Sequence, residues 1–362
     1  MQAGAERGGK LLQDKAIVAG TLGAAFAGGL AAVALGVPAG ALLGSSLTVA
    51  LLSAVTGRGA VPLRLRDAGF TAIGVALGGG IDPDLAARLP GWLPSLLLLM
   101  LSLVATLWLG TVALQRLAGL DRETAVLATA PGTMSNVIAL AVEGRGEVGV
   151  IMGLQVVRVL FLVLMVPPLS ALLDAGAIPA AAPHPPMRLV PLAVLLAAGF
   201  GLGMAGQRLR IPASCFLFGL LVSAGAHATG RVEGAVPDWA MFCGLAIAGG
   251  ALGTRVRGMG GASLRRMALA GAVMLGVTLS VSIAFAALTA ALTGLPLVQL
   301  WVAFAPGGVE VMAAIGLALG HDPAFIALHH FARILALVVL VPLALGRVRA
   351  QAGPGPSRQS AR

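Results

Sequence analysis

The sequence is poor in charged and aromatic residues. Only 10% of its 362 residues are charged, 4% are aromatic and tyrosine is absent, whereas 58% are hydrophobic and the mean hydropathy is +0.96. A soluble domain needs a polar shell that this composition cannot supply. The apolar stretches also lack the alternation of apolar and polar residues that a membrane β-barrel requires. The composition therefore predicts an all-α integral membrane protein, because helices satisfy their own backbone groups in lipid.

Cysteine and histidine are also scarce, with two and five residues. Cys215 and Cys243 lie in apolar segments and indicate no disulfide framework. The histidines do not form a spaced metal-ligand set with carboxylates or cysteines. No nucleotide-binding or hydrolase fingerprint stands in a suitable context. We therefore expect no metal, no cofactor and no enzymatic activity.

The net charge of +10 does not indicate a nucleic-acid partner. The arginines stand in short loops between apolar segments, and the chain has no room for a soluble DNA-binding domain. Loop arginines of this kind anchor a membrane protein on its cytoplasmic side, so the expected partner is the lipid bilayer. Residues 16–36 follow three basic residues like a signal sequence, but the apolar run is longer than a cleaved core. We interpret it as the first membrane helix.

An internal repeat is the most informative feature that the chain does contain. Residues 120–169 align without a gap with residues 295–344, 175 positions later, and 13 of the 50 aligned pairs are identical. Each copy has an Ala-Pro-Gly sequence followed by an apolar helix with one arginine, Arg158 or Arg333. The identical offset relates two further glycine-rich stretches, residues 74–78 and 249–253, whose glycines we expect to serve close helix packing. Pro38-Ala39 aligns with Pro212-Ala213 after a slip of one residue.

Twelve apolar segments, six in each half, can be placed along the chain. They cover residues 16–36, 38–56, 68–81, 92–115, 123–142, 148–173, 188–206, 211–228, 237–253, 264–292, 297–319 and 323–346. If all twelve segments cross the membrane, 14 loop lysines and arginines lie inside and 8 lie outside. If segments 123–142 and 297–319 instead enter and leave on the same side, 19 lie inside and 3 lie outside. The excess of basic residues on the cytoplasmic side favours the second arrangement.

This arrangement predicts two inverted repeats of about five crossings each, plus one Pro-Gly-broken or re-entrant segment per repeat. Both termini are then cytoplasmic, and we expect a multi-pass protein of the bacterial cytoplasmic (inner) membrane. The expected organisation is a cytoplasmic segment 1–15, membrane repeats 16–182 and 183–346, and a disordered basic tail 347–362.

The Pro-Gly sequences predict breaks in helices at membrane depth. Proline removes a backbone donor and glycine permits unusual angles, so each segment should be interrupted. The freed groups need protein or a water-filled cavity, and half-helix N-termini offer amides to an anion. A simple kink is the alternative, which two equivalent breaks make less favourable. The candidate substrate-binding residues at the breaks are Pro131, Gly132, Thr133, Ser135, Asn136, Pro306, Gly307, Gly308 and Glu310.

Two arginines inside apolar helices complete the candidate site. Arg158 and Arg333 lie too deep to reach the interface, and each shares a helix face with a polar residue three positions earlier, Gln155 or His330. His329 stands four positions before Arg333. A guanidinium suits a carboxylate or phosphate. Alternatively, each arginine binds backbone carbonyls of the neighbouring broken helix, and Glu310 forms a structural ion pair with Arg333 instead of coupling protons or orienting a ligand.

The second broken segment, Ala305-Pro-Gly-Gly-Val-Glu-Val-Met312, and the sequence His321-Asp-Pro-Ala-Phe-Ile-Ala-Leu-His-His-Phe-Ala-Arg333 resemble the AbrB-type bacterial membrane family. The resemblance covers almost the whole chain and implies a duplicated membrane domain. Members of the family carry labels such as regulator of gene expression, putative ammonia monooxygenase and transporter. The first copy departs from the motif, with Ser135 in place of Glu310 and Gly146-Glu147 in place of His321-Asp322.

The function that these features favour is secondary transport of a small solute, which we expect to be anionic and which protons could accompany. Any effect on gene expression would then be indirect, through altered solute levels. The alternative is a membrane-embedded ligand sensor or regulator of gene expression without net transport, and a membrane oxygenase is a weaker third hypothesis. The sequence leaves open whether the chain forms a homo-oligomer.

Overall fold

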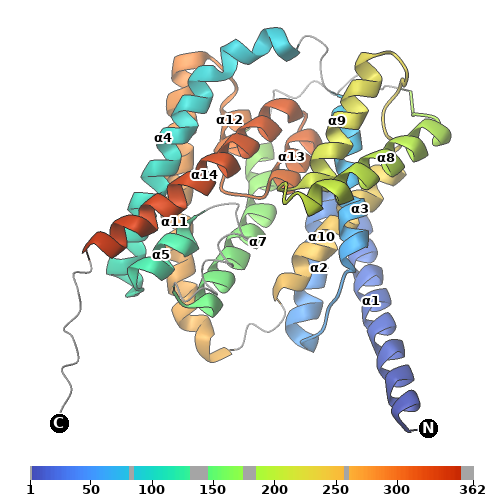
Figure 1. Cartoon of the computed structure of the whole chain (residues 1–362), viewed down its shortest axis with the longest axis horizontal. Coiled ribbons are helices and arrows are strands. Elements are labelled where there is room, and N and C mark those ends of the chain that lie inside the picture. Colours follow the sequence, from blue (N-terminus) through green and yellow to red (C-terminus); the bar gives the residue numbers. More distant parts are fainter. Residues whose placement is uncertain (1, 81–84, 131–145, 174–184, 257–260, 352–362) are drawn as a thin grey trace.

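The computed structural model of the chain is helical, and it describes residues 2–80, 85–130, 146–173, 185–256 and 261–351 (Figure 1). The helices are α1 (Gln2–Ala34), α2 (Gly40–Thr56), α3 (Leu63–Gly78), α4 (Leu85–Ala118), α5 (Arg122–Thr129), α7 (Val148–Leu173), α8 (Leu189–Arg208), α9 (Ser214–Ala228), α10 (Asp238–Gly253), the 3-10 turn η1 (Thr254–Val256), α11 (Gly261–Thr293), α12 (Leu297–Phe304), α13 (Val309–Ala318) and α14 (Pro323–Gln351).

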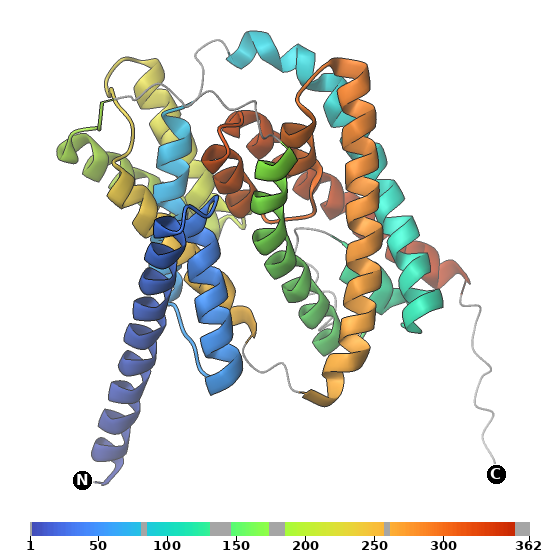
Figure 2. The ribbon, with the colours of Figure 1, turned by 180° about the vertical axis from the view of Figure 1, so that it is seen from behind.

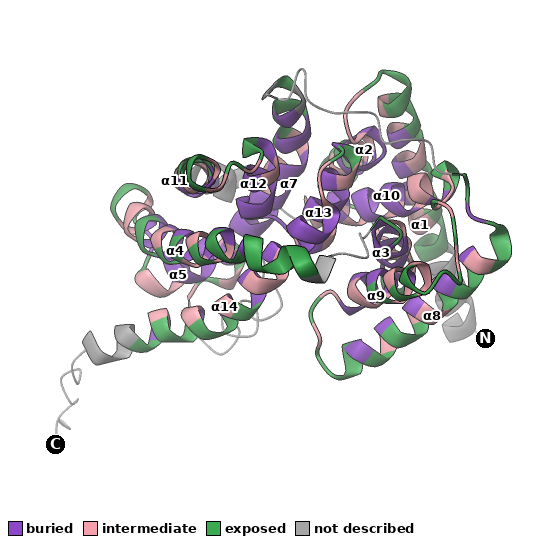
Figure 3. Cartoon of the chain, turned by 90° about the horizontal axis from the view of Figure 1, so that it is seen from above, coloured by how far each residue is buried: buried purple, intermediate pink, exposed green. Residues whose placement is uncertain are grey.

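The predicted all-α membrane fold is confirmed. Seven helices of the described residues are long and apolar enough to cross a membrane, and α2, α9 and α13 are shorter apolar helices. The outer surfaces of the long helices carry exposed apolar side chains such as Leu97, Trp108 and Val190, whereas α12 and α13 are largely buried in the middle (Figure 3). An apolar exterior over long helices is what a lipid environment demands.

Three helix ends differ from their expected positions. α1 begins at Gln2 and α14 continues to Gln351, so residues expected in the polar segment 1–15 and in the tail belong to helices. The alanine, leucine, glutamine, arginine and lysine in these stretches favour helix. α3 begins at Leu63, five residues before the predicted start of its short apolar segment.

Helices from the two halves of the chain cross at glycines. A Cβ atom on Gly74 of α3 would lie 2.2 Å from the carbonyl oxygen of Phe216 on α9, and one on Gly78 would lie 2.3 Å from that of Leu220. Any side chain here would push the two helices apart. The glycines of the first half therefore serve close packing, as the sequence indicated.

The equivalent crossing in the other direction pairs α10 of the second half with α2 of the first half. A Cβ atom on Gly249 of α10 would lie 2.6 Å from the carbonyl oxygen of Leu42 on α2. A Cβ atom on Gly253 would lie 2.6 Å from the carbonyl oxygen of Ser46 on α2. α2 and α9 also start alike, because Ala39 and Ala213 have left-handed backbones with φ of 52° and 50°. Each half therefore supplies one helix to each crossing.

The helices form two groups that both halves build (Figures 1 and 2). The first helix group contains α1–α3 and α8–α10, in which α3 packs against α8, α9 and α10, and α2 against α1 and α10. The second helix group contains α4, α5, α7 and α11–α14, in which α4 packs against α11, and α14 against α5, α12 and α13. Contacts of α13 with α3, and of α7 with α2 and α10, join the two groups.

The second Pro-Gly segment is broken where the sequence predicted, because α12 ends at Phe304 and α13 begins at Val309. The amide of Asp322, just beyond α13, donates to the side-chain oxygen of Gln299 near the start of α12 at 3.3 Å. The amide of Glu147 donates in the same way to the hydroxyl of Thr124 in α5 at 2.8 Å. In each half, the residue that follows the Pro-Gly segment is therefore hydrogen-bonded near the start of that segment, and whether the segments re-enter the membrane stays a prediction.

α5 and α12, the helices that precede the two Pro-Gly sequences, lie at different levels of the molecule. In Figure 1, α5 is in the lower part of the view and α12 in the upper part. The residues that follow α5, including the predicted break at Pro131-Gly132, lie outside the described residues. The opposite orientation of the two repeats across a membrane stays a prediction.

Candidate functional site

Arg333 holds the second break through backbone carbonyls. Its guanidinium donates to the carbonyl oxygen of Ala305 at 2.5 Å and to that of Gly307, and it is fully buried. Nε2 of His330, one turn earlier on α14, lies 3.1 Å from the carbonyl oxygen of Val302. The last carbonyls of a helix lack partners within it and carry a partial negative charge, which a cation satisfies.

Arg158 makes the equivalent contacts to α5, but more loosely. Its guanidinium lies 3.3–3.4 Å from the carbonyl oxygens of residues 128–130 and also donates to the side-chain oxygen of Gln155. Gln155 in turn donates to the carbonyl oxygens of Leu127 and Ala130 at 3.0 Å. These positions correspond to those around Arg333 at the offset of 175 residues. Carbonyl binding, the alternative left open by the sequence, is therefore what both arginines do.

An ion pair between Glu310 and Arg333, the alternative that the sequence left open, is not among the ion pairs of the described residues. The ion pairs seen among the described residues are Arg66–Asp67 at 2.7 Å and Arg88–Asp322 at 3.2 Å. Arg333 is directed at the carbonyls that end α12, whereas Glu310 belongs to the first turn of α13 beyond the break. The carboxylate therefore has to be explained in another way.

His329 belongs to a separate buried cluster. Its Nε2 lies 2.8 Å from the hydroxyl oxygen of Ser95 on α4, and its Nδ1 lies 2.8 Å from the carbonyl oxygen of Phe325. The ring of Phe325 lies against His329 and, edge-on, against Trp92 of α4. His329 is fully buried, so these contacts fix α14 on α4.

A cavity of about 540 Å³ lies between the two helix groups. Its walls come from α3, α8, α9 and η1 on one side and from α7, α13 and α14 on the other. The polar and charged residues that line it are Arg66, Asp67, Gln155, Arg158, Gln207, Arg210, Ser214, Arg255 and Glu310. Its volume is that of a site for a small molecule.

The second break forms one wall of this cavity. Pro306, Gly307 and Gly308 line it together with the first residues of α13. Gly308 occupies the N-cap position of α13 and provides no side-chain cap. The first amides of a helix have no acceptor within it and carry a partial positive charge. The break therefore presents backbone donors to the cavity.

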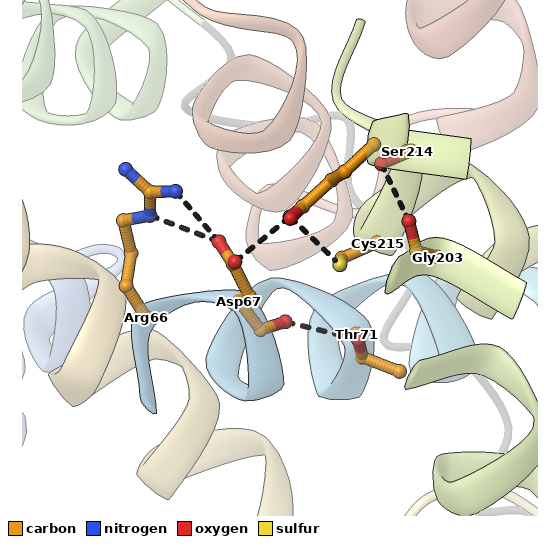
Figure 4. A network of polar contacts seen from close by, with 7 residues as sticks. Arg66, Asp67, Thr71, Gly203, Ser214 and Cys215 are labelled. Atoms are coloured by element: carbon orange, nitrogen blue, oxygen red, sulfur yellow. Dashed lines mark hydrogen bonds and ion pairs between the residues drawn. The ribbon is translucent and has the colours of Figure 1, made fainter. Parts of the chain in front are cut away.

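Asp67 organises the opposite wall (Figure 4). Its carboxylate accepts hydrogen bonds from Nε and Nη2 of Arg66 at 3.0 and 2.7 Å and from Nε2 of Gln207 at 2.8 Å. Gln207 also lies 3.4 Å from the sulfur of Cys215. Asp67 is 5% exposed, so its charge is held by these partners. The network fixes α3 to the end of α8 and the start of α9.

The structure brings together part of the predicted site. Six predicted residues line the cavity: Gln155, Arg158, Pro306, Gly307, Gly308 and Glu310. The residues His329, His330 and Arg333 are not among those lining it. Five more lie outside the described residues: Pro131, Gly132, Thr133, Ser135 and Asn136.

Sequence reasoning missed the residues that the first helix group contributes. The cavity is lined by Arg66, Arg210 and Arg255. Their positions between apolar segments of the sequence indicate only loop arginines that anchor the chain. Asp67 stands one residue before an apolar segment, and its counterpart at the repeat offset is Phe242, so the repeat carried no signal for it. Within the described ranges, no group of three histidine, cysteine or acidic residues could hold a metal ion.

These features define a multi-pass helical membrane protein with a charged cavity between two interlaced helix groups. The chain belongs to the AbrB family, described as transition state regulatory protein AbrB, which it matches over residues 42–349. It is similar to the uncharacterized protein YhjN of Bacillus subtilis (strain 168), with 26% identity over 292 residues and 76% of each chain covered.

Proposed function

We propose that the protein is a secondary transporter of a small anionic solute across the bacterial cytoplasmic membrane. The observation that carries this proposal is the cavity at the junction of the two helix groups. Four arginines line it against two carboxylates, and the second break adds the amides of a half-helix. Broken helices at the junction of repeats are characteristic of transporter sites.

The arrangement suits alternating access. The two helix groups contact each other through few helices, and the cavity lies where they meet. Sliding or rocking of one group on the other would therefore change the side of the membrane to which the cavity opens. Arg66 and Arg255 line the cavity next to the α2–α3 and α10–α11 connections. In the proposed topology these connections are cytoplasmic, and the cavity faces inward.

This topology has its own test. Single cysteines introduced at Arg58 and at Arg266 of a variant without native cysteines should resist a membrane-impermeant thiol reagent applied to intact cells and react after permeabilisation. Labelling of one position and not the other from outside would contradict the orientation proposed for the two repeats.

Glu310 is the residue that we assign to proton coupling. It lines the cavity, it forms no ion pair with another described residue, and the charges of Arg255 and Arg66 act on it. An acid in this position can exchange a proton with water in the cavity while it stays close to the bound anion.

Transport is tested by flux into proteoliposomes that contain the purified protein. The expected result is saturable uptake of an anion that a proton gradient changes and that Arg255→Gln reduces. Ligand binding without flux in the reconstituted protein would instead establish the sensor, and any effect on gene expression would then come from the ligand-bound state. Redox-active metal in the purified protein together with substrate oxidation would favour the oxygenase.

A further inference from the structure

The charges inside the cavity do not balance. Arg66 and Asp67 neutralise each other across a 2.7 Å ion pair. Three further arginines then face one carboxylate, Glu310, which leaves an excess of two positive charges in the cavity. Like charges that line one cavity repel each other, and Arg158 is only 1% exposed, so a ligand that balances them is favoured.

Arg158 has a donor without an acceptor. The terminal nitrogens of its guanidinium are used on the carbonyls that end α5 and on Gln155. Its Nε is buried without a hydrogen-bond partner, and the side chain, 1% exposed, lines the cavity. A buried donor of this kind costs free energy unless an acceptor reaches it.

Two other elements provide donors to the same cavity. The side chain of Arg255, in η1, forms no hydrogen bond or ion pair with any residue in the described ranges, although the charge of Glu310 acts on it. α13 contributes the amides of Val309 and Val311, which precede its first intrahelical hydrogen bond, from Met312 to Gly308, while the amide of Glu310 donates to the carboxylate of the same residue. Oxyanions are the ligands that guanidinium groups and helix N-termini share.

We propose that the cavity binds a doubly charged oxyanion, either a dicarboxylate or an inorganic oxyanion such as phosphate or sulfate. The inference rests on the proposed function for its physiological meaning, although it concerns binding alone. A monoanion would leave one positive charge unbalanced and a zwitterion would leave two. Nε of Arg158, the guanidinium of Arg255 and the amides at the start of α13 are the donors to the oxygen atoms.

The test uses the full-length protein purified in detergent and the shift of its thermal unfolding midpoint with added anion. Succinate, sulfate and phosphate are compared with acetate, chloride and glycine at mildly alkaline pH and constant ionic strength. A ligand that binds only the folded state raises the midpoint by mass action. We expect at least one dianion to reach half of its effect at about tenfold lower concentration than acetate, which corresponds to about 1.4 kcal/mol.

The panel also identifies the source of the ligand. Stabilisation by succinate assigns a dicarboxylate, and stabilisation by phosphate or sulfate assigns an inorganic oxyanion. Equal effects of acetate and the dianions, or no shift with any of the three dianions, overturn the inference.

Two variants and a matched control locate the site. Arg158→Gln removes the unused donor but also disturbs the carbonyls that end α5, so Arg255→Gln is the cleaner variant. Each should raise the required dianion concentration at least about tenfold. Arg64→Gln removes the same charge from an exposed position of α3 outside the cavity and should leave it unchanged. Equal effects of Arg64→Gln and Arg255→Gln would show that only overall charge matters and overturn the site.

Failure of this inference is distinguishable from failure of the proposed function. Dianion binding without flux in proteoliposomes keeps the site and removes the transporter. Flux of a monoanion without any preference for dianions keeps the transporter and removes the inference.

Discussion

The two halves of the chain make the same contacts with different strength. The helix crossings are nearly alike, since Gly74 and Gly249 both approach a carbonyl oxygen of the other half. The arginine contacts differ, because Arg333 lies 2.5 Å from the carbonyl oxygen of Ala305, whereas Arg158 lies at least 3.3 Å from the carbonyl oxygens that it contacts. Arg158 lines the cavity, and Arg333 is not among the residues lining it. Arg333 therefore secures the fold alone, whereas Arg158 is the arginine to which we assign a contact with the proposed ligand.

The largest effect should separate these two arginines. Arg333→Gln leaves the buried carbonyls of Ala305 and Gly307 without a donor, at about 1–3 kcal/mol each, and so should strongly lower the thermal unfolding midpoint. Arg158→Gln should lower it less, because the bonds it removes are longer. Both are measured by thermal unfolding in detergent. Equal losses in the two variants would remove the distinction between a structural and a ligand-accessible arginine.

The helix crossings should respond equally in the two halves. A Cβ atom at Gly74 or Gly249 meets backbone within 2.6 Å, so Gly74→Ala and Gly249→Ala should each destabilise by about 1–3 kcal/mol. Gly276→Ala on α11 is the matched control, since a Cβ atom there has no neighbour within 4 Å. The control should be neutral or slightly stabilising, because alanine favours helix. A clear difference between Gly74→Ala and Gly249→Ala in unfolding midpoint would show that the two crossings are not equivalent.

Glu310 should give the smallest change in stability. Without an ion pair to Arg333, Glu310→Gln should shift the free energy of unfolding by no more than about 0.5 kcal/mol, while flux loses its dependence on pH. The double variant Glu310→Gln/Arg333→Met should be as unstable as Arg333→Met alone. Higher stability of the double variant than of Arg333→Met would show that Glu310 and Arg333 do form an ion pair, contrary to the structure.

The repeat in the sequence predicted much of this architecture. It related Arg158 to Arg333 and Gln155 to His330, and each of these side chains lies next to carbonyls that end a short helix. The repeat could do so because the contacts are local to one half, between a broken segment and the helix that follows it. Helix breaks and glycine crossings also follow from local backbone chemistry.

The cavity could not be predicted in the same way. It requires the approach of α3, α8 and η1 to α7 and α13, and no spacing in the sequence records that approach. Arg66 and Arg255 line the cavity, although their sequence positions are sufficiently explained as those of cytoplasmic loop residues. Arg333 has the chemistry of a ligand-binding residue, but it is not among the residues that line the cavity. Burial and partner identity decide such roles, and both are properties of the assembled helices.

The exchange of helices at the glycine crossings determines how the protein must be made. α3 finds its partner α9, and α2 its partner α10, only after the second half has been synthesised and inserted. Until then the grooves at Gly74 and Gly78 have no helix to fill them. We therefore expect the first half to remain an incompletely assembled intermediate in the bilayer until α9 and α10, which are synthesised later, complete its packing.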